Sequence, residues 1–124
     1  MQLEKITDYI VKWLKEYALN AGMDGFVVGV SGGVDSGVTS TLCAMTGLKT
    51  LCVAMPIHQA KSHVNRAQEH ITQLQERFPN VTRTEVDLSP VFETLKTQVP
   101  QTNETDTLQL SLANTRARLR MTTL

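Results

Sequence analysis

Hydrophobic residues recur along this chain at two spacings, one typical of helices and the other of buried strands. Steps of three and four residues predict amphipathic helices over residues 3–21 and 60–78. Short, continuously apolar runs predict strands at 26–30 and 50–55, of the kind that a parallel sheet buries on both faces. A more alternating run at 81–86 predicts a third, more exposed strand.

Glycine, serine and proline mark the limits of two further helices. The segment 34–46 is predicted to be a helix that Gly47 ends in a left-handed conformation. Ser89 is expected to cap a short helix over 89–99, with Pro90 in its first turn.

The predicted elements alternate as strand–helix–strand–helix–strand. The polar segment 100–106 is expected to be a loop, and residues from Thr107 to the last one are expected to be helical. This order and the apolar strands predict an α/β fold, a doubly wound parallel sheet with right-handed crossovers. Ligands of such sheets bind at the carboxyl ends of the strands, so chemistry is expected after residue 30.

Composition fits one globular domain and excludes several other classes of protein. The 124 residues are 41% hydrophobic and 19% charged, unlike disordered or collagen-like chains. No apolar run approaches the roughly 20 residues that span a bilayer, and charged residues interrupt any secretory signal near the N-terminus. Cys43 and Cys52 have no CxxC spacing, which indicates two buried thiols in a reduced, cytoplasmic protein.

The charges balance in number but not along the sequence. Twelve basic and twelve acidic residues give a net charge of +0, which argues against duplex nucleic acid as the main partner. Residues 107–124 nevertheless carry Arg116, Arg118 and Arg120 and no acidic residue. This local cluster suits a small anionic ligand.

A glycine-rich segment follows the first predicted strand, where a ligand is expected. Two glycines between a strand and a helix allow a tight turn that directs N–H groups at an anion, and the helix dipole favours the same charge. Ser31 and Ser36 add hydroxyl donors. Asp35 would repel a bare phosphate, but it suits Mg²⁺ held between the carboxylate and phosphate oxygens. The candidate nucleotide-binding residues are Gly29, Val30, Ser31, Gly32, Gly33, Val34, Asp35 and Ser36.

Three other glycine motifs are alternative interpretations of this segment. No lysine follows Gly33 until Lys49, which excludes a Walker A loop, and no Gly-x-Gly occurs for a dinucleotide fingerprint. The letters of residues 29–33 do match the GxSxG elbow of α/β-hydrolases. That fold needs a histidine after its acidic residue, and no histidine follows Asp87. The elbow also leaves the functions of Asp35 and Ser36 unexplained.

The six residues SGGVDS at 31–36 resemble the pyrophosphatase loop of the N-type ATP pyrophosphatases. The resemblance implies a Rossmann-like sheet of the adenine nucleotide alpha hydrolase type. It also implies that the loop holds the phosphates of Mg-ATP, which is split into AMP and pyrophosphate as a substrate is adenylated.

A second segment narrows the resemblance to one family. Asn114-Thr115-Arg116-Ala117-Arg118-Leu119-Arg120-Met121 is similar to the NxxARxRM segment of NAD synthetases, and a helix over residues 1–22 leads directly to the loop strand. The family implies a ligase that amidates deamido-NAD to NAD with ammonia. The nicotinate carboxylate is first adenylated by ATP, and ammonia then displaces AMP.

The resemblance assigns roles to particular residues. Arg118 is expected to bind deamido-NAD with Asn114 beside it, since residues four apart share a helix face. Asp35 is expected to bind the metal, and Ser31 and Ser36 the pyrophosphate, so these three are the candidate catalytic residues. Met55, at the end of the second strand, is expected beside the adenine. The family also implies a homodimer.

Other side chains receive ordinary structural interpretations. Arg116 and Arg120 are expected to be solvated or at an interface. Residues expected to pack within the last helix or at the dimer interface are Leu108, Leu112, Ala117 and Met121. The histidines are expected at the surface or in loops, namely His58, His63 and His70.

The family's downstream GTxNxxE-like segment, with a second metal carboxylate, does not occur in this sequence. Residues 1–124 are therefore expected to be the N-terminal part of a single, apparently truncated, synthetase domain. One alternative is an inactive nucleotide- or phosphate-binding half-domain. Another is a different adenylating pyrophosphatase, such as a tRNA-thiolating enzyme, which would need reactive cysteines at the site.

Overall fold

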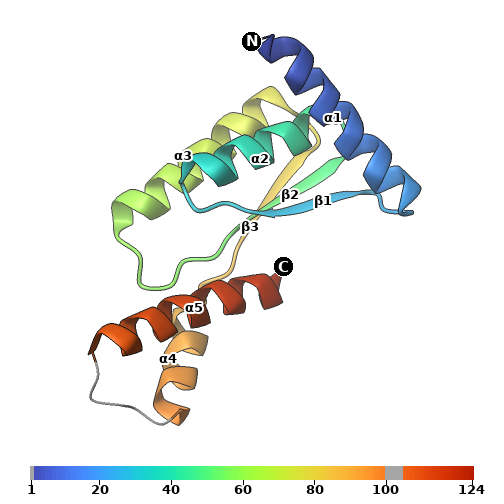
Figure 1. Cartoon of the computed structure of the whole chain (residues 1–124). Coiled ribbons are helices and arrows are strands. Elements are labelled where there is room, and N and C mark those ends of the chain that lie inside the picture. The colour runs from blue at the N-terminus through green and yellow to red at the C-terminus, as the bar shows by residue number, and fades with distance from the viewer. Residues whose placement is uncertain (1, 100–104) are drawn as a thin grey trace.

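The computed structural model describes residues 2–99 and 105–124, which form a layered α/β structure (Figure 1). Strands β1, β2 and β3 form a parallel sheet in the order β1-β2-β3, with Val28 opposite Cys52 and Cys52 opposite Arg83. The elements are α1 (Leu3–Asn20), β1 (Gly25–Gly29), α2 (Val34–Met45), β2 (Lys49–Ala54), α3 (Lys61–Arg77), β3 (Val81–Glu85), α4 (Ser89–Gln98) and α5 (Thr105–Thr123). The predicted α/β fold with a parallel sheet is confirmed.

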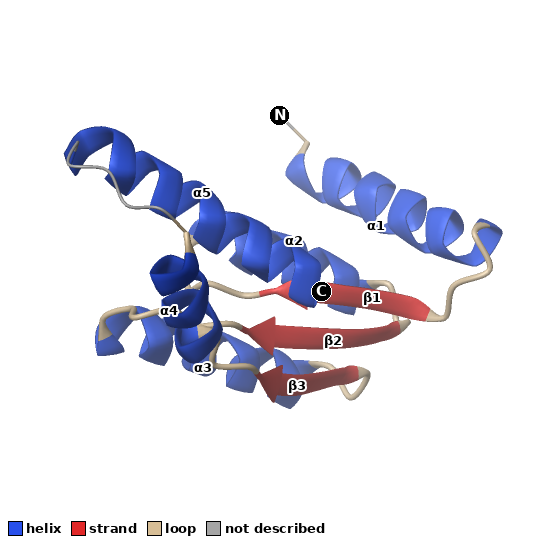
Figure 2. Cartoon of the chain, turned by 90° about the horizontal axis from the view of Figure 1, so that it is seen from below, coloured by secondary structure: helices blue, strands red, loops and turns tan. Residues whose placement is uncertain are grey.

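Helices lie on both faces of the sheet. Helices α2 and α3 cover one face, and α4 and α5 lie against the other, in front of the strands in Figure 2. The core under α2 and α3 is formed by Val30, Ala44, Cys52, Ala54, Ala67, Ile71, Leu74 and Val81. The core under α4 and α5 is formed by Val53, Met55, Ile57, Leu88, Phe92 and Leu112.

Most element limits agree with the hydrophobic pattern to within one or two residues. Gly47 has φ of 79°, so it ends α2 in the predicted left-handed conformation. Strand β3 is buried at Val81 and exposed at its other residues, as its polar alternation predicts. The two cysteines are free and buried, also as predicted.

The predicted cap of α4 is wrong. Ser89 is the first helical residue rather than the N-cap, and its Oγ accepts a hydrogen bond from the His58 N–H at 3.0 Å. The Ser89 N–H instead donates to Asp87 Oδ1 at 2.9 Å. This backbone bond, together with a bond to the Ser89 side chain, lowers the pKa of Asp87. Asp87 therefore supplies the acceptor that Ser89 was expected to provide.

The last helix begins earlier than predicted. Residues 105 and 106 already belong to α5, while 100–104 of the predicted loop lie outside the described residues. Within the described ranges, no helix is long and apolar enough to cross a membrane.

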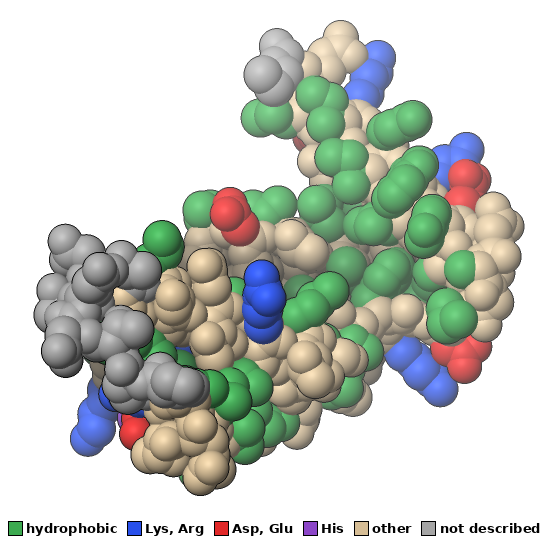
Figure 3. Space-filling view, turned by 60° about the horizontal axis from the view of Figure 1, so that its bottom comes forward, with side chains coloured by type: hydrophobic (Ala, Val, Ile, Leu, Met, Phe, Trp, Pro, Cys, Tyr) green, Lys and Arg blue, Asp and Glu red, His purple; other side chains and the backbone are tan. Residues whose placement is uncertain are grey.

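Helix α1 carries an apolar stripe that the rest of the chain does not cover. Hydrophobic side chains follow this helix along the upper right of Figure 3. The Trp13 and Tyr17 rings stack with centroids 5.2 Å apart. The exposed apolar residues of the stripe are Leu3, Ile6, Tyr9, Trp13 and Tyr17.

Candidate functional site

The glycine-rich loop lies where the first strand ends and the helix α2 begins. The Val30 N–H still donates to the Val53 carbonyl at 2.9 Å, so the parallel pairing continues one residue past β1. The chain then turns through residues 31–33 and enters α2 at Val34. The predicted loop therefore occupies the carboxyl end of a strand and the N-terminus of a helix, where α/β sheets bind ligands.

Two serine hydroxyls brace this loop. Ser36 Oγ accepts a hydrogen bond from the Ser31 N–H at 3.1 Å and donates to the Gly33 carbonyl at 3.3 Å. The Ser31 and Ser36 hydroxyl oxygens are 3.2 Å apart, and Ser31 Oγ accepts the Gly33 N–H at 3.3 Å. These hydrogen bonds fix the conformation of the turn, which lies at the surface of the protein.

The glycines leave the start of α2 open to a ligand. Gly33 is the N-cap and makes no side-chain capping bond, so the first-turn N–H groups lack that partner. Gly32 has φ of +88°, and an added Cβ would lie 2.8 Å from the His63 carbonyl oxygen. A side chain at this position would therefore be strained and would also collide with the backbone of α3.

Asp35 is exposed in the first turn of α2, beside the loop. An exposed carboxylate next to uncapped N–H groups is the donor type that Mg²⁺ takes together with phosphate oxygens. Among the described residues no group of three His, Cys, Asp or Glu could hold a metal by itself. The residues present thus fit a metal ion shared with a nucleotide rather than a metal held by protein ligands alone.

A cavity of about 280 Å³ joins the loop to the last helix. Met55 is 7% exposed and packs in the core under α4 and α5, and it also lines this cavity. Met55 lies close to Gly29, since a Cβ there would be 3.0 Å from the Met55 Cε. The lining residues are Gly29, Val30, Ser31, Met55, Gln59, Ala117, Arg120, Met121 and Leu124.

Arg120 is the charged residue of this cavity, and it is partly buried rather than fully solvated. Its Nε donates to the Met55 carbonyl at 2.9 Å. Burial, together with the nearby charge of Arg116, lowers the pKa of Arg120 from its ordinary value. Arg116 itself lies over the Phe92 ring, 5.5 Å from the centroid, so it too is held by the protein.

The residues predicted to bind the substrate do not line this cavity, although Asn114 lies on the same stretch of α5 as the lining residues Ala117 and Met121. Asn114 and Arg118 are both exposed, and neither lines the cavity beside the loop. The inward face of α5 is instead formed by Leu108, Leu112 and Leu119, which pack against α4 and the sheet. The structure therefore keeps Asn114 and Arg118 together on one helix face but does not bring them to the loop.

The residues of α5 expected to pack in the chain or at a dimer interface fall into two groups. Leu108 and Leu112 pack within the chain, whereas Ala117 is exposed and Met121 is 75% exposed, so for these two the interface stays a prediction. Both line the cavity beside Arg120. Sequence reasoning missed Arg120 and Gln59, and the only available signal was the position of Arg120 inside the NxxARxRM segment.

The histidines divide into two groups. His58 and His63 are exposed, as expected, and His58 Nε2 lies 2.8 Å from Glu93 Oε1. His70 departs from the expectation because it is half-buried and its Nε2 lies 2.8 Å from the hydroxyl of Ser40. Burial lowers the pKa of His70 below the ordinary value of a histidine.

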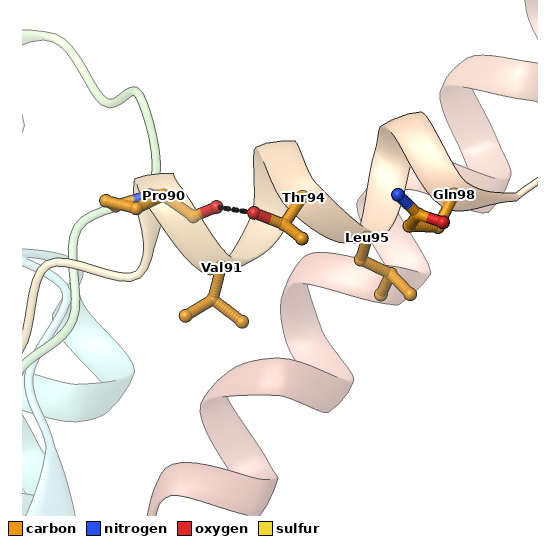
Figure 4. A pocket seen from close by; sticks show the side chains of 5 residues that line it. All are labelled: Pro90, Val91, Thr94, Leu95 and Gln98. Atoms are coloured by element: carbon orange, nitrogen blue, oxygen red, sulfur yellow. Dashed lines mark hydrogen bonds between the residues drawn. The ribbon is translucent and has the colours of Figure 1, made fainter.

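Another hollow, of about 440 Å³, lies on α4 and contains none of the predicted site residues (Figure 4). Its one internal hydrogen bond among the residues drawn runs from Thr94 Oγ1 to the Pro90 carbonyl at 2.9 Å. It is lined by Pro90, Val91, Thr94, Leu95 and Gln98. With no charged residue in its lining, it gives no reason to place nucleotide chemistry there.

Comparison with known proteins identifies the family of the chain. The NAD synthase family matches residues 6–124. An NH(3)-dependent NAD(+) synthetase of Mesoplasma florum is 34% identical over 125 residues, which cover 100% of this chain and 49% of that protein. The chain thus spans about half the length of the curated relatives it matches.

Solved structures give the same result. The NH3-dependent NAD synthetase of Campylobacter jejuni, in complex with nitrate, has a TM-score of 0.84 at 28% identity and is matched over 51% of its length by 100% of this chain. The NMN synthetase of Francisella tularensis has a TM-score of 0.84 at 27% identity, over 100% of this chain and 49% of that one.

The glutamine-dependent NAD+ synthetase of Acinetobacter baumannii, in complex with ADP, is 20% identical and shares the fold, with a TM-score of 0.81 over 100% of this chain and 23% of that one. Family match and structural likeness therefore extend over essentially every residue of the sequence. The chain belongs to the NAD synthase family.

Proposed function

We propose that this chain serves the ATP- and Mg²⁺-dependent amidation of deamido-NAD to NAD with ammonia. The observation that carries the proposal is the family match over residues 6–124, which includes both the loop and α5. In the proposed reaction a carboxylate oxygen of the substrate attacks the α-phosphorus of ATP. The bond between the α-phosphorus and the bridging oxygen breaks and pyrophosphate leaves. Ammonia then forms a C–N bond at the acyl carbon, AMP leaves and a proton is released.

The loop is proposed to hold the phosphates of ATP. Its N–H groups at the start of α2 have no side-chain cap and would donate to phosphate oxygens, as would the hydroxyl of the exposed Ser31. The Ser36 hydroxyl would join them by exchanging its bond to the Gly33 carbonyl for one to a phosphate oxygen. Asp35 would hold Mg²⁺, which when bound offsets the negative charge of the phosphates. Preorganised donors of this kind stabilise charge without reorganising during the reaction.

The cavity between the loop and α5 is proposed to accept the nucleoside part of ATP. Met55 offers an apolar surface there and Arg120 a cation that is already held in place by its bond to the Met55 carbonyl. Asn114 and Arg118 are proposed to bind deamido-NAD from the exposed face of α5. The NMN synthetase among the similar structures makes a mononucleotide an alternative substrate, which a product assay can distinguish.

A second candidate function is a nucleotide- or phosphate-binding half-domain without catalysis. The observation behind it is that the hydrogen bonds closing the loop lie within residues 31–36, so this part can bind a phosphate without further elements of a synthetase. A tRNA-thiolating function is disfavoured because both cysteines are buried, and burial raises the pKa of each thiol.

Domain organisation, compartment and oligomeric state complete the proposal. Residues 1–124 are proposed to be the N-terminal part of one synthetase domain, with the helix over 1–22 leading into it. The two free thiols support a reduced, cytoplasmic compartment. The exposed apolar residues Leu110 and Met121 of α5 support a homodimer formed near this helix.

The purified chain should be incubated with Mg²⁺, ATP, deamido-NAD and ammonium, and AMP and NAD should be quantified by chromatography. Formation of both in equal amounts is the outcome that the synthetase proposal expects. ATP binding by calorimetry without AMP formation would favour the half-domain. Absence of ATP binding by a folded chain would contradict both.

A further inference from the structure

A buried hydrogen bond connects the loop helix to the next crossover helix. Ser40 on α2 is 0% exposed, and its Oγ lies 2.8 Å from Nε2 of His70 on α3. The same oxygen lies 2.7 Å from the Ser36 carbonyl and 3.1 Å from the Gly37 carbonyl, one turn earlier in α2. The family resemblance assigned no role to either His70 or Ser40.

The direction of these bonds follows from the number of protons available. A hydroxyl has one proton, and the short distance to the Ser36 carbonyl accounts for it. The Ser40 oxygen is then left to accept a hydrogen bond from His70 Nε2–H, which assigns the ring the tautomer with its proton on Nε2. Burial lowers the pKa of His70 and so favours the neutral ring.

The chain of bonds ends at the loop itself. The peptide whose carbonyl Ser40 holds belongs to Ser36, and the Ser36 hydroxyl accepts the Ser31 N–H at 3.1 Å. His70 also lines a hollow of about 580 Å³ together with the loop glycines Gly32 and Gly33.

Two residues on one face of helix α3 contact the loop region. The Gly32 backbone lies against the His63 carbonyl, and the His70 ring lies against α2, where a Cβ on Gly37 would be 3.7 Å from the ring Cε1. Residues 63, 67 and 70 follow the spacing of one face of a helix, so a single rigid element supports both points.

We propose that His70 is a positioning residue for the phosphate-binding loop and acts through Ser40. Its Nε2–H fixes the Ser40 hydroxyl, which holds the Ser36 peptide and so the first turn of α2 in the geometry that presents N–H groups to a phosphate. The proposal rests on the proposed function of the loop. It adds a residue on α3 that has no contact with the ligand itself.

The test is a set of substitutions read by binding of inorganic pyrophosphate in calorimetry. His70→Leu and Ser40→Ala should each weaken binding about fivefold, the size of one hydrogen bond of about 1 kcal/mol. The double variant should be no weaker than Ser40→Ala, because both changes break the same link. His70→Gln should bind within about twofold of the original chain, since its amide nitrogen can occupy the position of Nε2.

His63 offers matched controls on the same helix. It is exposed, and no side-chain hydrogen bond to it occurs among the described residues. His63→Leu and His63→Gln should both leave pyrophosphate binding unchanged. Should His70→Leu fail to fold, Ser40→Ala and His70→Gln carry the comparison alone, because each changes a side chain by little volume.

Hydrogen exchange of the loop amides gives a second readout that does not need a ligand. Exchange over residues 31–37 should be faster in His70→Leu and restored in His70→Gln. If the original chain binds no pyrophosphate, the proposed function fails, and this exchange pattern alone decides the role of His70. Unchanged loop exchange in His70→Leu, or equal effects of Leu and Gln on binding, would overturn the proposal.

Discussion

The two sides of the candidate site are built in different ways. The loop side is made by backbone: the turn at Gly32, the helix start at Gly33 and the two serine hydroxyls that brace them. The α5 side is made by long side chains, above all Arg120, whose position depends on which face of the helix packs against the sheet. The comparison teaches that the hydrogen bonds of a loop can be encoded locally, whereas the charged side chain across the cavity is placed by the packing of a distant helix.

The support behind each side differs as well. The loop rests on α2 and α3, which pack on a continuous apolar core that includes the fully buried Cys52 and Ile71. The opposite face of the sheet is less covered, since Val27 on β1 is 51% exposed. We therefore expect substitutions in the loop to lower stability and nucleotide binding more than substitutions on α5 do.

The largest effect is expected for Gly32→Ala. The alanine Cβ would meet the His63 carbonyl at 2.8 Å in a left-handed conformation, so the free energy of unfolding should fall by about 3 kcal/mol and nucleotide binding should be lost. The measurement is urea unfolding.

Gly22→Ala is the matched control for this change. Gly22 also has positive φ, but nothing lies within 4 Å of its added Cβ, so it should cost only about 1 kcal/mol. Equal costs at both positions would show that close approach to α3 does not shape the loop.

Asp35→Asn should weaken Mg-ATP binding by at least about tenfold, or 1.4 kcal/mol, while ATP binding without Mg²⁺ changes little. The exposed carboxylate makes no contact that folding needs, so the thermal midpoint should stay within a degree or two, as expected for a change of about 0.5 kcal/mol or less at the surface. Asp8→Asn on the exposed face of α1 is the control. Calorimetry that finds the same Mg²⁺ dependence in Asp35→Asn would remove this residue from the metal site.

Substitution of Arg120 should destabilise the protein more than substitution of Arg118. Arg120→Met loses a charge-assisted bond to the Met55 carbonyl and should cost about 1–2 kcal/mol of unfolding free energy. Arg118→Met alters an exposed side chain and should change stability by no more than about 0.5 kcal/mol. Urea unfolding of both variants checks this difference, and a larger loss for Arg118→Met would reverse the assignment of the two helix faces.

The smallest effect concerns pH. Because burial lowers the pKa of His70 in the folded chain, the unfolded chain binds the extra proton more readily, and stability rises with pH across this transition. The contribution is complete above the ordinary histidine pKa of about 6.5 and is lost as the pH falls through the lower value of the folded state. Thermal unfolding from pH 7.5 to 5 should therefore show a shallower slope in His70→Gln than in the original chain. An identical slope would contradict the burial of this ring.

Local patterns in the sequence predicted the loop well because each of its determinants lies within a few residues. The hydrogen bonds that close the turn join Ser31, Gly33 and Ser36, so spacing alone indicated it. The close approach of Gly32 to the His63 carbonyl on α3 was not visible in the same way. The strands were equally visible, since burial on both faces leaves a continuous apolar run.

Contacts between distant elements could not be predicted in this way. His70 was expected at the surface or in a loop, because its bond to Ser40 joins residues on two helices. The bond of Arg120 to the Met55 carbonyl was not foreseen, because the inward face of α5 was not known. Ser89 has the preferred chemistry of a cap, but Asp87 reaches the same N–H, and the Ser89 hydroxyl is occupied by the His58 N–H. In each case a tertiary contact competed with a local preference and prevailed.

The central claim is that residues 31–36 bind the phosphates of ATP. The most direct measurement is a titration of the ¹⁵N-labelled chain with Mg-ATP, following the backbone amides by NMR. Saturable shifts concentrated at Gly32, Gly33 and Val34, and lost in Gly32→Ala, are the expected result. Shifts that are absent from the loop, or spread evenly over the chain, would contradict the claim.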